Sequence, residues 1–426
     1  MKAKHLLTLL LLTLCSLPFI TKAQDAAKPE EKEEEKPAVT ISGYLDSYYL
    51  HAFNRPASGN LMGSGNTAGP YFAGRAFDRL TDQFALGLVQ TKFAYSDKHA
   101  DMVIDLTFGP NAELGNFGNQ RAMAPGGYTT GFYPNNPNQS ALYGTSAAIK
   151  QAYFTWKATS KLSFTVGQFG THIGYEVIDA PINYHYSLSN LFNNGPFYHV
   201  GAKANYAFSD KVALMVGIVN NWDALTDWKT QKSAIAQLYF KPVDGWNVYL
   251  NYIGGHNDDG FKSGATGAGT TVGNAAYPGY ITSGYNRQLF DITTGYQITD
   301  KFYVGLNAAY GWYKFSDKDN EAAIVAAYQK MKPTWGGAAL YVNYAISDIV
   351  GIGARVEHFE DKYAVRYIGA TNNSVTVTAP ITLADGHLIV KPELRVDTSP
   401  TKIYENHDGN ATNSQQTLGM AFIYKY

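Results

Sequence analysis

The feature that most constrains this chain is an alternation of apolar and polar side chains with a period of two. It recurs in segments of about ten residues from Val39 to the C-terminus. In residues 301–312 one parity carries Phe302, Val304, Leu306, Ala308, Tyr310 and Trp312. The other parity carries Tyr, Gly, Asn and Ala. Because side chains i and i+2 share a face of a β-strand, the pattern predicts strands with one apolar and one small, polar face.

Charged residues sharpen this interpretation. They alternate with apolar side chains on two further segments, at Arg355, Glu357, Lys391, Glu393, Arg395 and Asp397. A stripe of charges cannot enter a dry core without a large desolvation cost, so this face must meet water or charged partners. The apolar face then has to meet something other than a protein core.

Two kinds of connection separate the segments. Seven are short and similar in sequence: 96–98, 159–161, 209–211, 243–245, 299–301, 347–348 and 384–386. Eight are long and polar: 54–80, 110–145, 171–197, 222–231, 257–286, 316–333, 362–372 and 399–415. These connections join sixteen strands whose two ends lie on the short-turn side, as in single-chain outer-membrane barrels. The sequence therefore predicts an all-β transmembrane antiparallel barrel over residues 39–426, with short periplasmic turns and long extracellular loops.

Membrane physics and composition support this fold. Lipid offers no hydrogen-bond partner, so a sheet that spans it must close on itself. Charged residues make up 16% of the chain, against roughly 25% in soluble domains. The last strand alternates up to an aromatic end at Tyr426, which resembles the signal that barrel-assembly machinery recognises. The alternative is a secreted β-sandwich or adhesin with its apolar face inside, but sixteen strands are too many for one sandwich.

The N-terminus has two further segments. Residues 1–23 combine Lys2 and Lys4 with an apolar stretch and a small-residue cleavage site, which predicts a secretory signal peptide; a lipoprotein signal at Cys15 is the alternative. Residues 24–38 are acidic, Lys- and Pro-rich and predict a disordered segment. Removing the signal takes three of the 34 basic residues and leaves 35 acidic ones. This balance lacks the basic footprint of a nucleic-acid-binding protein.

Two stretches carry a family resemblance, residues 41–54 and 168–206. The most specific piece is Gly174-Tyr175-Glu176, followed by the Asn-x-x-Tyr-Ser pattern that ends at Ser187. These residues resemble the OmpL-like putative beta-barrel porin-2 family, and the resemblance spans residues 39–426. It implies an outer-membrane porin for passive diffusion of small hydrophilic solutes or ions. His185 and His199 are a departure that leaves the solute preference open.

No catalytic or metal site stands out. None of the ten histidines belongs to a His-Glu-x-x-His or Cys/His pattern, and His172, His185 and His199 lack the regular spacing of a metal site. Ser187, His185 and Asn183 are too close in sequence to build a catalytic relay with a separate oxyanion hole. We therefore expect no enzymatic activity, no metal and no cofactor.

The loop of residues 171–197 is the best candidate for a constriction. It is unusually apolar and aromatic, and it needs a wall to pack against. We expect it to fold into the barrel and to set the narrowest point, with a lid over the mouth as the alternative. The expected pore lining is Glu176, Asp179, Asn183 and His185 on the loop and Arg355, Glu357, Lys391, Glu393, Arg395 and Asp397 on the wall. Of the wall residues, we expect Arg355, Lys391 and Arg395 to face the loop across the constriction.

Three questions stay open at this level. Residues 319–332 have the composition of a short helix that would cap the mouth or pack on other loops. A plugged structural or adhesin-like barrel is the alternative to a pore. A homo-oligomer is compatible with sixteen strands, but one sequence does not show contacts between copies.

Overall fold

The computed structural model describes residues 38–61, 75–121, 148–225, 232–257, 271–272, 275–276, 285–315, 333–362, 366 and 368–426. The predicted signal peptide, nearly all of the predicted disordered segment and the predicted helix of residues 319–332 lie outside the described residues.

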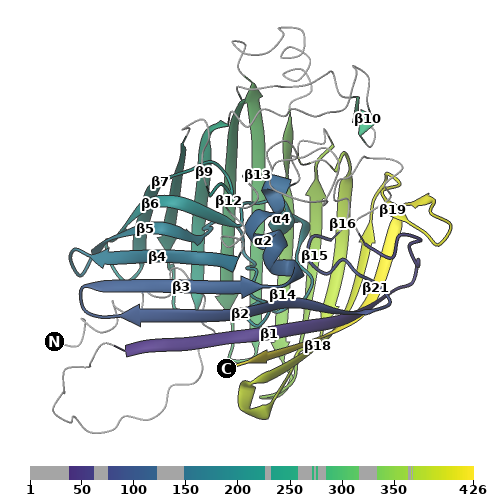
Figure 1. Cartoon of the computed structure of the whole chain (residues 1–426), viewed down its shortest axis with the longest axis horizontal. Coiled ribbons are helices and arrows are strands. Elements are labelled where there is room, and N and C mark those ends of the chain that lie inside the picture. Colours follow the sequence, from purple (N-terminus) through teal and green to yellow (C-terminus); the bar gives the residue numbers. More distant parts are fainter. Residues whose placement is uncertain are drawn as a thin grey trace.

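Within these residues, sixteen long antiparallel strands form one closed barrel (Figure 1). The first eight are β1 (Ala38–Ala52), β2 (Phe84–Ser96), β3 (Ala100–Phe108), β4 (Ile149–Lys157), β5 (Leu162–Gly170), β6 (Tyr198–Ala207), β7 (Val212–Val219) and β8 (Ser233–Phe240). The others are β9 (Trp246–Asn257), β12 (Tyr285–Gln297), β13 (Phe302–Phe315), β14 (Thr334–Ala345), β15 (Gly351–Glu360), β16 (Thr371–Thr378), β18 (Leu388–Thr398) and β21 (Ser414–Lys425). The predicted fold class and strand number are confirmed.

Closure of the barrel joins the two ends of the chain. β1 pairs with β21 from Tyr44 opposite Lys425 to Ala52 opposite Thr417. The Gly43 N–H donates to the Tyr426 carbonyl at 3.3 Å, and the Tyr426 N–H donates to the Gly43 carbonyl at 3.1 Å. The last strand therefore removes the free edge that β1 would otherwise present.

The alternation places apolar side chains outside and charges inside. On β15 and β18, Val356 is 53% exposed and Leu394 is 45% exposed, whereas Arg355 and Arg395 are 0% and 2% exposed. The same contrast follows the wall around the barrel. The exposed apolar side chains form the outer surface that faces lipid, as the period-two pattern predicts.

Four of the short turns resemble one another because a hydroxyl has the same role in each. The side chains of Thr159, Ser209, Thr299 and Ser347 accept hydrogen bonds from backbone N–H groups two or three residues further on. This is the Ser/Thr turn motif, which satisfies backbone donors where strand pairing stops. The connection between β16 and β18 is longer than expected, because it contains the short strand β17 (Ile381–Leu383) and the 3-10 turn η2 (Ala384–Gly386).

The long loops contain little regular structure. The described part includes α2 (Pro110–Arg121), α4 (Asn190–Asn193) and two small hairpins, β10 (Thr271–Val272) with β11 (Ala275–Ala276) and β19 (Tyr404–Glu405) with β20 (Ala411–Thr412). None of the helices in the described residues is long and apolar enough to cross a lipid bilayer.

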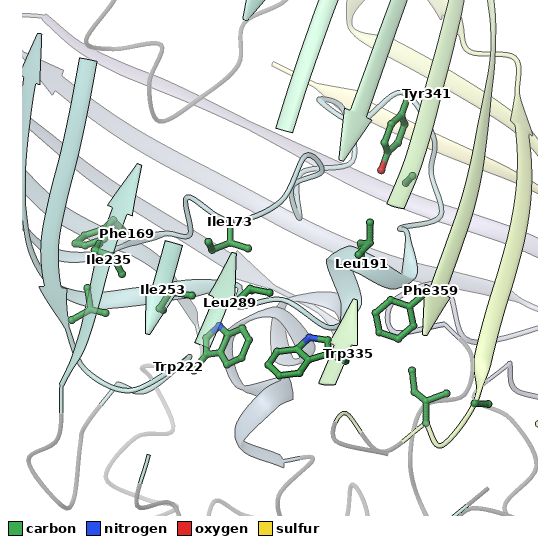
Figure 2. Packing of buried hydrophobic residues seen from close by; sticks show 14 of the residues in the cluster. Phe169, Ile173, Leu191, Trp222, Ile235, Ile253, Leu289, Trp335, Tyr341 and Phe359 are labelled. Atoms are coloured by element: carbon green, nitrogen blue, oxygen red, sulfur yellow. The ribbon is translucent and has the colours of Figure 1, made fainter. Parts of the chain in front are cut away.

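Apolar side chains from the loops pack against inward-facing strand residues. One cluster joins Ile173 and Leu191 of the third long loop to Leu289, Trp335 and Phe359 of the wall (Figure 2). A second cluster joins Ala112 of α2 and Ala180 of the third loop to Tyr44, Leu88, Ile389 and Ile423. The hydrophobic core therefore lies inside the barrel, and the first three long loops supply its centre.

The outward placement of Leu394 yields a stability prediction. Leu394→Arg should lower the free energy of unfolding by about 2–4 kcal/mol, because the charge would enter the lipid near mid-strand. Leu383→Arg is the matched control: Leu383 is similarly exposed, at 42%, but lies beside the turn, where the cost falls to about 0–1 kcal/mol. Urea titration of barrels folded into vesicles measures both. Equal losses would contradict the assignment of these faces.

Candidate functional site

The third long loop, residues 171–197, crosses the barrel interior; we call it the inner loop. It makes contact with strands on several sides of the wall. The His172 Nε2 lies 2.9 Å from the Tyr252 carbonyl of β9, and the Gly174 N–H donates to Asp291 of β12 at 3.0 Å. The Tyr186 hydroxyl donates to Asp46 of β1 at 2.6 Å. A lid over the mouth would not reach these inward-facing groups, so the loop folds inward.

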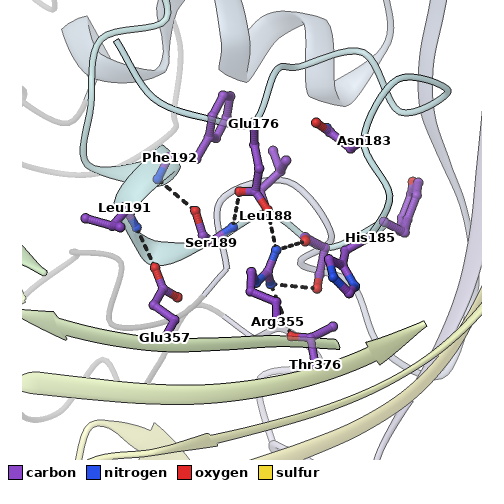
Figure 3. Close-up of polar contacts among 12 residues, drawn as sticks. Glu176, Asn183, His185, Leu188, Ser189, Leu191, Phe192, Arg355, Glu357 and Thr376 are labelled. Carbon is purple, nitrogen blue, oxygen red and sulfur yellow. Dashed lines mark hydrogen bonds and ion pairs between the residues drawn. The ribbon is translucent and has the colours of Figure 1, made fainter. Parts of the chain in front are cut away.

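The central attachment is a buried ion pair between Arg355 of β15 and Glu176 of the loop. The Arg355 Nη1 lies 2.5 Å from the Glu176 Oε1, and both residues are at least nine-tenths buried (Figure 3). The same guanidinium donates to the Ser187 carbonyl at 2.7 Å and to the Thr376 hydroxyl at 3.2 Å. The second oxygen of Glu176 accepts from the Ser189 N–H at 2.7 Å. The pair therefore fixes both arms of the loop to the wall.

Glu357 holds the short helical turn of the loop. Its carboxylate accepts from the N–H groups of Asn190 at 2.9 Å and Leu191 at 2.8 Å, at the start of α4 (Figure 3). The Ser189 hydroxyl accepts from the Phe192 N–H at 3.1 Å and caps the same turn. These partners satisfy N–H groups that a helix start leaves without intrahelical acceptors.

The charged stripe of β18 holds the loop backbone. Glu393 accepts from the Tyr186 N–H at 2.7 Å and from the Ser187 N–H at 3.1 Å. Lys391 donates to the carbonyl of Ala180 at 2.7 Å and also to that of Asn183. These side chains bond directly to the loop.

Arg395 completes this stripe. It donates to the Leu188 carbonyl at 2.8 Å and to Asp397 at 2.8 Å. All six predicted wall residues are inward and buried, with Glu393 the most exposed at 7%.

The prediction that the loop residues face the wall cations across an open gap is wrong. Glu176 and Arg355 touch. Asp179 turns instead to Lys150 of β4, with 2.5 Å between the Lys150 Nζ and the Asp179 Oδ2, and to Gln90 at 2.8 Å. Asn183 closes a turn of its own loop, donating to the Val177 carbonyl at 2.5 Å.

His185 lies among positive side chains. Its Nδ1 is 2.7 Å from the Thr378 hydroxyl, and it is 1% exposed. The rings of His172 and His199 lie 5.5 Å apart, and the His185 ring lies 6.2 Å from that of Tyr341. Among the described residues, no group of three or more His, Cys, Asp or Glu could hold a metal ion.

Sequence reasoning missed two parts of the interior. Arg75 of the first long loop is 1% exposed and bonds to Asp78 and to the Thr417 hydroxyl of β21. Its Nη2 also lies 3.6 Å from Asp397. In the second long loop, α2 packs against β2, β3 and β4. Charges spaced three residues apart in a polar loop gave no signal that distinguished Arg75 and Asp78 from solvated residues.

The buried pair yields a second prediction. Arg355→Met should lower the free energy of unfolding by about 3–5 kcal/mol, because Glu176 would stay buried without its cation. The double variant Arg355→Met/Glu176→Gln should recover most of this loss. Lys241→Met, at the exposed pair with Asp244, is the control and should cost about 1 kcal/mol or less. Tryptophan fluorescence in urea measures all three, and a double variant as unstable as the single one would contradict the pairing.

His185 yields a prediction on pH. Burial lowers its pKa from 6.5 to about 3, and Arg355, Lys391 and Arg395 act in the same direction against Glu393. A released loop regains the ordinary pKa, so below about pH 6.5 it binds a proton that the docked loop does not. The docked loop is then at its most stable above about pH 6.5. By about pH 5 the free energy of docking is about 2 kcal/mol less favourable, which raises the ratio of released to docked loop about thirtyfold.

Amide hydrogen exchange of the inner loop, corrected for its intrinsic pH dependence, measures this loss. His185→Gln should reduce the pH dependence, and His185→Gln/His172→Gln should reduce it further, since burial also lowers the His172 pKa, to about 4. His407→Gln, at an exposed loop histidine, is the control. Identical pH profiles for His185→Gln and the unchanged chain would refute the role of His185.

Comparisons with known proteins agree with this architecture. The barrel resembles OmpT of Vibrio cholerae, with a TM-score of 0.52 and 12% identity over 93% of this chain and 100% of that chain. It also resembles an anion-selective porin from Comamonas acidovorans, with a TM-score of 0.52 and 8% identity over 92% and 100% of the two chains. The channel DcaP of Acinetobacter baumannii gives 0.51, with 11% identity over 93% and 99%. At these identities the likeness establishes the fold.

The family follows from the sequence itself. No curated protein matches the chain. The family model described as "Putative beta-barrel porin-2, OmpL-like" matches residues 38–426, which is the whole barrel. The chain therefore belongs to the OmpL-like beta-barrel porin-2 family and is an outer-membrane channel protein.

Proposed function

We propose that this porin lets small hydrophilic solutes diffuse passively through a water-filled lumen that the inner loop narrows. The observation that carries the proposal is the polar, charged inner face of a closed barrel, crossed by one loop that is bonded to the wall. A polar lumen lowers the cost of moving a hydrated solute across the membrane, and a loop across it limits the size of that solute.

The proposed constriction combines the two sets of predicted lining residues. On the loop these are Glu176, Asp179, Asn183 and His185, and on the wall Arg355, Glu357, Lys391, Glu393, Arg395 and Asp397. Their proposed role is to fix the position of the loop, because each of them is engaged in a bond to the loop or to a neighbouring wall residue. A fixed loop gives the channel a constant size limit.

Transport is proposed to be non-enzymatic. Ser187 is 0% exposed and its hydroxyl lies 3.3 Å from the Arg355 guanidinium, inside the barrel rather than on the lipid-facing surface. A serine nucleophile for lipids would need access from the membrane and an adjacent base. Neither condition fits this environment.

We also propose that residues 1–23 direct export and that residues 24–38 are a spacer before the barrel. The basic start and apolar stretch of the first segment support export. The machinery that assembles barrels is the expected partner during insertion, and outer-membrane lipid surrounds the mature protein.

A conductance experiment tests the function and the constriction together. Refolded protein in a planar bilayer should show discrete current steps in potassium chloride. Deletion of residues 178–190 should increase the single-channel conductance, because it removes the segment that spans the lumen. The control is deletion of residues 406–410, the tip of the β19–β20 hairpin, which should leave conductance unchanged.

Two outcomes would contradict the proposal. The absence of current steps from correctly folded protein would favour a plugged structural or ligand-binding barrel. The many contacts of the inner loop inside the lumen are compatible with that alternative. Equal conductance with and without residues 178–190 would remove the constriction from the inner loop while retaining the pore.

A further inference from the structure

The inner wall of the barrel has two unlike sectors. The charged sector comprises β15, β16, β18, β21 and β1–β4, and its buried charges on β15 and β18 are bonded to the inner loop, to the first long loop or to neighbouring strands. The uncharged sector comprises the inward faces of β5–β9 and β12–β14. The inward charged residues described in that sector are Lys203, Arg287 and Asp291, each less than 9% exposed.

These three charges are covered. Asp291 accepts from Asn251 at 2.7 Å, from Asn307 at 2.5 Å and from the inner-loop backbone. Arg287 stacks on Trp222 at 3.7 Å from the ring centroid, and Lys203 lies 4.4 Å above the ring of Phe169. A solute moving along this sector would therefore meet no exposed charge of these three residues.

Tyrosines are what this sector leaves partly exposed. The side chains of Tyr239 and Tyr249 lie 5.0 Å apart between β8 and β9. The Tyr175 hydroxyl of the inner loop donates to the Tyr303 hydroxyl of β13 at 2.8 Å, and the Tyr175 ring stacks on Tyr341 of β14 at 4.2 Å. Tyr175, Tyr249 and Tyr303 keep intermediate exposure. Tyr249 and Tyr303 lie on β9 and β13, on either side of β12, and Tyr175 of the inner loop contacts Tyr303; we call these three rings the tyrosine arc.

Glycines let these rings lie against the wall. Gly295 of β12 and Gly305 of β13 are direct neighbours in the sheet. A Cβ at Gly295 would lie 2.0 Å from the Tyr303 hydroxyl oxygen, and one at Gly305 would lie 2.5 Å from the Tyr175 hydroxyl oxygen. The rings thus cover bare backbone on one side. Because Tyr303 and Tyr175 are still partly exposed, their remaining surface faces the lumen.

The neighbouring polar groups are neutral. Asn205 and Asn247 point inward with intermediate exposure, and the Asn247 side chain accepts from the Tyr239 hydroxyl at 2.9 Å. The Tyr303 hydroxyl accepts the bond from Tyr175 and retains its own hydrogen to donate. Flat aromatic surface beside neutral donors and acceptors suits a solute with an apolar ring face and a hydroxylated rim.

We propose that the solutes this porin favours are neutral polyhydroxylated rings, that is, small sugars, which slide along the tyrosine arc at Tyr249 and Tyr303. This inference rests on the proposed channel function and specifies its substrate class. The buried charges of β15 and β18 are used to hold the inner loop, and along the uncharged sector the side chains left to meet the solute are uncharged. Ions gain little from such a path, because a selective pore needs exposed charges or dipoles along it.

Swelling of proteoliposomes in isosmotic solutes tests this. Three probes share six carbons and a similar mass: D-glucose is a neutral ring, D-sorbitol is a neutral open chain, and sodium gluconate is an open-chain anion. The expected order of entry rates is glucose, then sorbitol, then gluconate, with glucose about fivefold faster than sorbitol, which is the size of one aromatic contact.

The variants separate stacking from size. Tyr303→Leu and Tyr249→Leu should each bring the glucose-to-sorbitol ratio close to one, whereas Tyr303→Phe keeps the ring and should preserve most of the ratio. Tyr310→Leu, an outward tyrosine that is 57% exposed, is the control and should leave the ratio unchanged. Heat-modifiable gel migration establishes that each variant has folded; if Tyr303→Leu does not fold, Tyr249→Leu carries the test.

The outcomes distinguish this inference from the proposed function. If the protein gives current steps in potassium chloride but the glucose-to-sorbitol ratio is unchanged in both leucine variants, the tyrosine path is refuted and the porin function stands. Faster entry of gluconate than of glucose would refute the preference for neutral solutes. No current and no swelling with any probe would refute both.

Discussion

The structure depends on one constraint: lipid cannot hydrogen-bond to a peptide group. A sheet that spans the membrane must therefore pair all its strands, and the pairing of β1 with β21 meets that demand at the seam. Closure in turn creates an interior that is shielded from lipid. Only that interior can accept the charges of β15 and β18, which explains why the period-two pattern separates apolar from charged residues so sharply.

The inner loop turns these interior charges into structural bonds. An irregular segment has backbone N–H and C=O groups without strand or helix partners, and burial makes each of them costly. The wall supplies both kinds of partner, since cations meet carbonyls and carboxylates meet N–H groups. The pairs are Arg355 with Ser187, Lys391 with Ala180, Arg395 with Leu188, Glu357 with Leu191, and Glu393 with Tyr186. Side chains of alternating charge along the wall thus supply the hydrogen-bond partners that a neighbouring strand would otherwise give the loop.

Sequence periodicity predicted the barrel, its sixteen strands and the faces of the strands, because each depends on local spacing. The loop that enters the lumen was predicted from its apolar, aromatic composition. Periodicity could not predict which charged residues contact one another. The parity of a residue gives the face of the strand on which it lies, but not its position along the barrel axis or its partner across the lumen. Lys150 shows the difficulty: it lies at a break in register between β3 and β4, where both Lys150 and Gln151 reach Asp105. Arg75 comes from a polar loop that has no period at all.

The positions of the loop anchors also set an order of assembly. Lys391 bonds to the carbonyl of Ala180, 211 residues earlier in the chain. The carboxylates that hold the loop backbone lie on β15 and β18, near the end of the sequence. Contacts this distant form late, because loop-closure entropy must be overcome first. The inner loop can therefore be anchored only after β15 and β18 have been synthesised and have joined the wall, so the N-terminal half of the barrel cannot fix the loop by these contacts.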